Sequence, residues 1–117
     1  MGAPAAGAVV LVHFPFSDLS RSKLRPAVVL ADVGRGDLLL CQITSKPYGD
    51  PLTITLDDAA FTSGTLRVTS YARPGKLFTA NTNIIGSEIA MLKPDVRARV
   101  VDALVMLLRA GTDTVST

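Results

Sequence analysis

Short apolar runs rich in β-branched residues recur along the first 90 residues, separated by polar segments that contain glycine or proline. These runs predict strands over residues 8–16, 27–33, 38–44, 52–56 and 65–72, with a short further strand over 84–91. Pro26 cannot donate a ladder hydrogen bond, so it is expected at the start of the second strand. The segment Gly34-Arg35-Gly36-Asp37 is typical of a hairpin turn. Gly75 is expected to interrupt the strand pattern.

The end of the chain has a different periodicity, typical of a helix. Lys93-Pro94-Asp95 is a start signal, and the helix is expected to run to about Arg109. Spacings of three and four place its apolar residues on one stripe that should face the sheet: Val96, Val100, Ala103, Leu104, Leu107 and Leu108. Antiparallel strands followed by one terminal helix predict a mainly β domain, a small curled sheet or half-barrel with the helix packed on it.

Length and composition indicate one domain that spans residues 1–117. Its core should lie at about 7–109, with frayed tails at 1–6 and 110–117. Hydrophobic residues make up 48% of the chain against 19% charged, an excess that favours an oligomer with a buried apolar face. The apolar runs are far shorter than the roughly 20 residues that cross a bilayer. With one cysteine and no secretory signal pattern, a cytoplasmic protein is expected.

Charge is informative through its distribution. The formal net charge is only +2, which is weak support for a nucleic-acid partner. However, Arg21, Lys23 and Arg25 follow one another at alternate positions with no acid among them. In an extended loop these three cations would share one side, which makes a local phosphate-binding surface plausible.

Several classes of catalytic site lack the residues that they need. The chain has a single histidine, His13, and a single cysteine, Cys41, and both lie in apolar strands. A catalytic triad and a zinc site with paired ligands are therefore unsupported, and both residues are interpreted as structural. Asp57-Asp58 is interpreted as a solvated turn, and the glycines form no phosphate-binding motif. We expect neither a metal nor a cofactor.

Two segments resemble the MazF/PemK family of toxin endoribonucleases. The first is FPFSDLSRSKLRPAVVL at residues 14–30, with an Arg-Pro pair that opens the second strand, and the other is LCQITSKP at 40–47, with a threonine that ends the third. The similarity continues in order through residues 70–79, Ile85-Gly86 and the final helix, and so covers about 7–109. It implies an SH3-like barrel of the PemK/MazF/CcdB type, assembled as a two-fold homodimer.

The resemblance also assigns roles to individual residues. It implies that Arg25 stabilises the scissile phosphate and relays protons, and that Thr44 holds the phosphate or the 2′-hydroxyl. Arg73 matches a third cationic position, suited to phosphate binding or to the leaving group. Relatives with that arginine carry an acid two residues later, where this chain has Gly75, and the histidine that some relatives carry in the first loop is absent.

Further residues are expected to contact RNA at the same mouth of the barrel, with Tyr48 as the residue best suited to stack on a base. They are Ser22, Lys23, Gln42, Ser45, Lys46 and Tyr48.

The function implied is that of an mRNA interferase, the toxin of a type II toxin–antitoxin system. Such an enzyme cleaves single-stranded RNA at a short sequence without the ribosome or a metal, because the 2′-hydroxyl of RNA is itself the nucleophile. The partner would be an antitoxin whose acidic, partly disordered segment covers the basic mouth. Two alternatives stay open: a non-enzymatic toxin of the same fold that binds DNA gyrase, and a module that binds RNA without cutting it.

Overall fold

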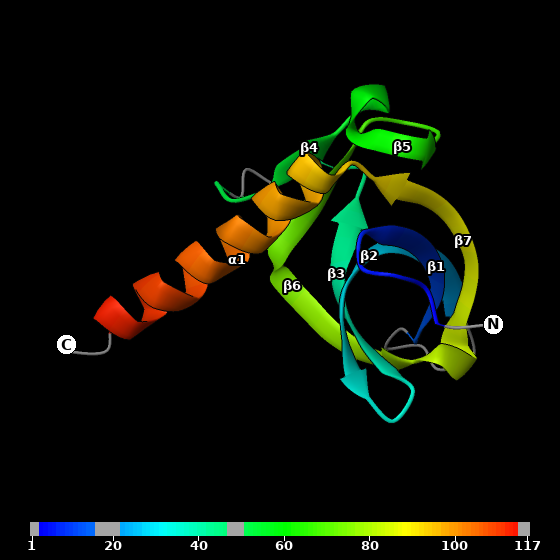
Figure 1. The fold of residues 1–117 in the computed structure, drawn as a ribbon, viewed down its shortest axis with the longest axis horizontal. Coiled ribbons are helices and arrows are strands. Elements are labelled where there is room, and N and C mark those ends of the chain that lie inside the picture. The colour runs from blue at the N-terminus through cyan, green and yellow to red at the C-terminus, as the bar shows by residue number, and fades with distance from the viewer. Residues whose placement is uncertain (1–2, 16–21, 47–50, 115–117) are drawn as a thin grey trace.

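The chain folds as a single curled antiparallel sheet with one helix packed on it (Figure 1). The computed structural model describes residues 3–15, 22–46 and 51–114, with the backbone alone for 14–15, 22–23 and 112–114. Seven strands follow the spatial order β4-β6-β3-β2-β1-β7-β5. Their bounds are β1 Ala8–Pro15, β2 Ser22–Gly34, β3 Asp37–Thr44, β4 Ile54–Leu56, β5 Phe61–Gly64, β6 Ser70–Asn81 and β7 Ile85–Leu92, and α1 spans Pro94–Thr114. The expected mainly β half-barrel with a terminal helix is confirmed.

The hairpin between β2 and β3 forms where the glycines predicted it. Gly34 pairs with Asp37, and both residues between them have positive φ, 59° at Arg35 and 80° at Gly36. Such a two-residue turn matches the right-handed twist of the strands that it joins. The third strand is therefore confirmed to within one residue.

The second strand begins earlier than expected, at Ser22 rather than at residue 27. Residues 22–26 pair with β1, and Pro26 lies opposite Leu11 inside the strand. Pairing of β2 with β3 begins only at Ala27. Proline is tolerated here because it lies where that second ladder ends, so its missing N–H removes no hydrogen bond from it.

The largest correction concerns residues 61–81. Residues 61–64 form β5, which was not expected, and the strand predicted over 65–72 is wrong for 65–69. Those residues form a loop in which the Thr65 hydroxyl donates to Oδ1 of Asp58 (3.0 Å) instead of lying in a strand. Gly64 has φ 66° and lies so close to β7 that it turns the chain out of the sheet there.

Gly75 does not end a strand, because β6 continues through it to Asn81 as a long bulge. Cys41 is paired with Leu77 and Ile43 with Ala72, so residues 73–76 of β6 lie opposite the single residue Gln42 of β3. A bulge adds length and twist to one strand without breaking the sheet. It places Arg73, Pro74, Gly75 and Lys76 beside Gln42 of β3.

Both faces of the central strands are covered by apolar groups. One face packs with β4, β5 and the start of α1, through Val9, Val28, Cys41, Ile43, Leu56, Phe61, Val96 and Val100. The other face packs beneath the second half of β6 and β7, through Val10, Val12, Ala27, Val29, Leu38, Leu40 and Ala80. Strand alternation assigns each residue to one of these faces.

Helix α1 continues to Thr114, five residues beyond the expected end. Val96, Val100 and Ala103 of the predicted stripe are buried, but Leu108 is 62% exposed, so the stripe faces the sheet only in the first half of the helix. The reason is geometric: the helix is longer than the sheet surface beneath it and extends past it (Figure 1). No helix among the described residues has the length and apolarity to cross a membrane.

Candidate functional site

Arg25 and Thr44 are brought together by the strand register. Arg25 lies opposite Val12 on β1, and Ala27 lies opposite Gln42 on β3. The ladder between β2 and β3 begins at this second pair, and Arg25 and Thr44 each lie two residues beyond it, at the same end of the two strands. Residues that lie opposite one another share a face of the sheet. Strand alternation from Ala27 and Gln42 therefore assigns Arg25 and Thr44 to one face of the sheet, at the same end of two neighbouring strands.

Both side chains are half-buried. The Nε atom of Arg25 is buried, so its guanidinium lies against the protein rather than in open solvent. The Thr44 hydroxyl accepts a hydrogen bond from the backbone N–H of Lys46 (3.2 Å). A hydroxyl that accepts one hydrogen bond can still donate another, so this contact orients Thr44 as a donor.

Arg73 reaches the same face through the bulge of β6. It is half-buried, and like that of Arg25 its Nε atom is buried. Ala72 lies opposite Ile43, so the next position places Arg73 beside Gln42. Two arginines and a threonine thus come from three adjacent strands. Guanidinium groups keep their charge at any working pH and bind phosphate oxygens through paired N–H donors.

Cys41 precedes Gln42 on β3, and its side chain is buried in the apolar core on the opposite face of the sheet. Burial raises the pKa of the thiol to about 12, although the backbone N–H of Arg73 acts in the opposite direction. Since the thiolate is the reactive form, a thiol with this pKa is a poor nucleophile. The expectation of a small core residue is confirmed. His13 is in β1 as expected, and its side chain is exposed.

Gly75 occupies the position where some relatives have an acid. A side chain added there would meet Leu107 Cδ2 of α1 at 3.8 Å, an ordinary van der Waals distance. It would therefore point toward the helix. The structure brings no carboxylate to Arg73 at this position, and its geometry gives no reason to expect an Arg-Asp pair there.

The other expected RNA contacts are divided among several locations. Gln42 is half-buried on the face of Thr44, while Lys46 is exposed just beyond it. Ser22 and Lys23 lie in β2, and their side chains are outside the described residues, as are Arg21 and Tyr48. Ser45 follows the end of β3 and lines a separate cavity.

The cavity next to Ser45 measures about 460 Å³ and borders the site at Arg25. Its walls come from β1, β2, β3, β7 and the loop 65–69, and its polar lining includes Ser45, Arg67 and Ser70. Strand alternation assigns Arg25 to the opposite face, yet the residue also borders this cavity. Arg25 thus lies at the end of the sheet, where the two faces meet.

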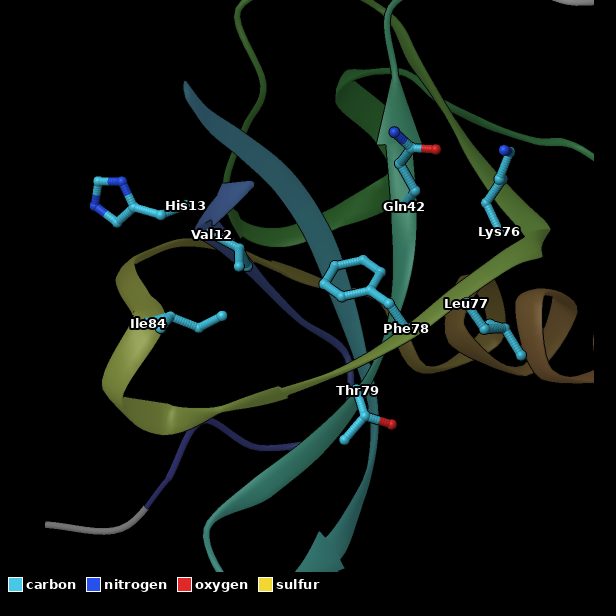
Figure 2. A pocket seen from close by; sticks show the side chains of 8 residues that line it. All are labelled: Val12, His13, Gln42, Lys76, Leu77, Phe78, Thr79 and Ile84. Carbon is cyan, nitrogen blue, oxygen red and sulfur yellow. The ribbon is translucent and has the colours of Figure 1, made fainter. Parts of the chain in front are cut away.

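Another cavity, of about 490 Å³, opens on the face of Gln42 and Thr44 (Figure 2). It is lined by Val12, His13, Gln42, Lys76, Leu77, Phe78, Thr79 and Ile84. Neither lining set contains an acidic residue, whereas the cavity of Figure 2 contains Lys76 and the other contains Arg25 and Arg67. Both cavities therefore favour an anionic ligand.

Sequence reasoning missed two groups of residues at the site. Tyr71 is half-buried opposite Thr44. It lies two residues before Arg73, so strand alternation could have predicted that both share one face of the sheet. Lys76 and Phe78 carried no such signal, because the bulge changes which residues of β6 share a face. Among the described residues no cluster of three or more metal-ligating side chains occurs. The site as built can bind a phosphodiester and present a hydroxyl donor to it.

Comparison with known proteins agrees with this arrangement. Residues 5–108 match the family model described as PemK-like, MazF-like toxin of type II toxin–antitoxin system. The MazF structure from Deinococcus radiodurans is 25% identical with a TM-score of 0.72, and the match covers 92% of this chain and 98% of that one. A MazE-MazF structure from the same organism has the same identity and TM-score, with 90% and 95% covered.

A more distant match has the same fold. Mycobacterium tuberculosis toxin MazF-mt6 is 14% identical with a TM-score of 0.70, over 87% of this chain and 96% of that one. A search of curated protein sequences finds no significant match.

Proposed function

Because this chain belongs to the family of PemK-like, MazF-like toxins of type II toxin–antitoxin systems, we propose that it is an endoribonuclease acting on single-stranded RNA. It cleaves at a short sequence, without the ribosome and without a metal, and its cellular location is the cytoplasm. The observation that carries the proposal is the placement of Arg25 and Thr44 at the same end of the neighbouring strands β2 and β3, with Arg73 on the adjoining strand β6.

The reaction uses the nucleophile that RNA already contains. The 2′-oxygen attacks the adjacent phosphorus, a new 2′-O–P bond forms, and the bond from phosphorus to the 5′-oxygen breaks. The products are a 2′,3′-cyclic phosphate and a 5′-hydroxyl. The protein must align these atoms, stabilise the added negative charge on phosphorus and help to move one proton from the 2′-oxygen and one to the 5′-oxygen.

Each of the three residues has a role that fits its place. Arg25 donates to the non-bridging phosphate oxygens, where negative charge increases in the transition state, and relays protons. Thr44, oriented by Lys46, donates to a phosphate oxygen or holds the 2′-hydroxyl. Arg73 stabilises the departing 5′-oxygen. Their half-buried setting strengthens these interactions, because charges interact more strongly away from bulk water.

The partner in the cell is an antitoxin. Solved structures similar to this chain include MazE-MazF complexes, in which the MazF chain is bound to MazE. We propose that an acidic, partly disordered antitoxin segment folds over the arginine cluster and competes with RNA there. The toxin itself acts as a two-fold homodimer, consistent with its apolar excess.

The test is incubation of the purified protein with a long single-stranded RNA in EDTA, followed by mapping of the fragment ends. We expect cleavage at a recurring short motif, with 5′-hydroxyl and 2′,3′-cyclic phosphate ends, lost in Arg25→Ala. Arg35→Ala is the matched control, because Arg35 is an exposed arginine in the hairpin turn between β2 and β3. Cleavage that Arg25→Ala retains would contradict the proposal.

One observation favours the alternative function, binding to DNA gyrase. The exposed second half of α1 carries a row of apolar residues, including Val105, Met106 and Leu108, as a helix that binds another protein would. Intact RNA with a folded protein would favour that function. Met106→Asp would then abolish gyrase inhibition, and Arg25→Ala would leave it unchanged.

A further inference from the structure

The cavity in Figure 2 has the chemical features of a nucleobase pocket, and we propose that it binds one unpaired base of the RNA beside the scissile phosphate. The proposal rests on the proposed function and adds to it the structural source of sequence selection. The cavity of about 490 Å³ is within the roughly 300–1,000 Å³ typical of small-ligand sites.

Phe78 gives the pocket an aromatic wall. Its ring points into the cavity, toward Val12 and Ile84, and the side chain is half-buried (Figure 2). Phe78 lies opposite Leu40 on β3, so its backbone is fixed within the sheet. An unpaired base loses its stacking partners when it leaves the strand, and an aromatic face replaces them.

Gln42 gives the pocket a group that can distinguish bases. Its amide has both a donor and an acceptor, and the side chain is half-buried at the edge of the cavity (Figure 2). Bases differ in the order of donors and acceptors along their edges, and glutamine amides read such edges in pairs of hydrogen bonds. A stacking surface alone would accept any base, so Gln42 is the residue that provides selectivity.

Lys76 completes the site with a positive charge. It is exposed and lines the same cavity, and its side chain lies on the same side of the pocket as Gln42 in Figure 2. An ammonium group there would contact the phosphate that follows or precedes the bound base. Lys76 gives a largely apolar lining without an acid one positive charge, which suits a base that is attached to an anionic strand.

The position of the pocket connects it to the cleavage site. Gln42 is two residues from Thr44 on β3, which places their Cα atoms about 7 Å apart on one face of the sheet. One nucleotide spans a distance of that order. A base held at Gln42 therefore belongs to a nucleotide next to the phosphate held by Arg25 and Thr44. The bulge of β6 is what brings Lys76 and Phe78 to this location.

The experiment measures binding separately from cleavage. A random pool of short single-stranded 2′-fluoro RNA lacks the attacking hydroxyl, so binding can be selected and the bound sequences read without strand cleavage. We expect the wild-type protein to select one base at one position. Phe78→Leu should weaken binding about tenfold, and Phe78→Tyr, which keeps an aromatic ring, should restore it. Gln42→Leu should abolish the base preference at that position.

Lys76→Met provides an internal comparison. It should weaken binding of all sequences equally and reduce the slope of log affinity against log salt by about one, with the base preference unchanged. Circular dichroism and thermal melting of each variant establish that it is folded. If Phe78→Leu and Gln42→Leu bind RNA with the same base preference and affinity as wild type, the proposal is overturned. This result would overturn it even if both variants lost affinity for an antitoxin peptide.

The two proposals fail in different ways. If the wild-type protein selects a base through Phe78 and Gln42 but leaves unmodified RNA intact, cleavage is refuted and the base pocket is supported. If it cleaves RNA at a motif that neither variant changes, cleavage is supported and the base pocket is refuted.

Discussion

Replacement of Gly64 by alanine should destabilise the fold by about 2–5 kcal/mol, more than the same change at any other described glycine with a positive φ. Gly64 ends β5 with φ 66°, a conformation that costs an alanine about 1–2 kcal/mol. A Cβ there would also press on the Ile89 carbonyl oxygen and lie 2.8 Å from Ala90 Cα. Both are backbone atoms of β7, so β5 must move away, at about 1–3 kcal/mol.

Two other glycines separate these terms. Gly34 has φ 95° and nothing within 4 Å of an added Cβ, so Gly34→Ala should cost only the conformational part, about 1–2 kcal/mol. Gly111 lies in α1 with open space around it, and Gly111→Ala should stabilise the protein by about 0.5–1 kcal/mol. Urea unfolding, monitored by circular dichroism, gives the three free energies. A cost at Gly64 no larger than that at Gly34 would refute the reasoning about β5 and β7.

Two further predictions concern Cys41 and Gly75. Because burial raises the pKa of Cys41 to about 12, the folded state holds this proton more tightly than the unfolded state, so stability should fall as pH rises from about 9 to 12. The free energy of unfolding of wild type minus that of Cys41→Ala, measured across this range, should decline by up to about 1.4 kcal/mol per pH unit, and a flat difference would contradict the buried thiol. Gly75→Asp should change the RNA cleavage rate less than about threefold, because a Cβ at this position lies 3.8 Å from Leu107 Cδ2 of α1. A tenfold gain in single-turnover rate would show that the acid reaches the site.

Much of the fold could be predicted from local patterns. Alternating apolar residues identified the central strands, and the glycines around Arg35 identified the hairpin turn. The errors lie where tertiary contacts override local signals. Pro26 was expected to start a strand, but pairing with β1 extends β2 back to Ser22. Gly75 was expected to interrupt the strand pattern, but the pairing on both sides of the bulge continues β6 through it.

The site could be predicted only in part for the same reason. The resemblance to the family supplied Arg25, Thr44 and Arg73, but the sequence contains nothing that shows which residues lie opposite one another. Register between strands determines that Tyr71 faces Thr44 and that residues 73–76 face Gln42. A bulge of this length cannot be recognised from the alternation of apolar and polar residues along the strand. For this reason the cavity at Phe78 was not predicted.

The most direct test of the central claim is a double-mutant cycle on RNA cleavage with Arg25→Ala, Thr44→Val and the double variant. Single-turnover rates are measured on one RNA that contains the wild-type cleavage motif. If both side chains act on one phosphate, each single variant should lose at least about a hundredfold in rate, and the double variant should lose much less than the product of the two. Losses that multiply independently, or single variants that cleave at the wild-type rate, would contradict the account.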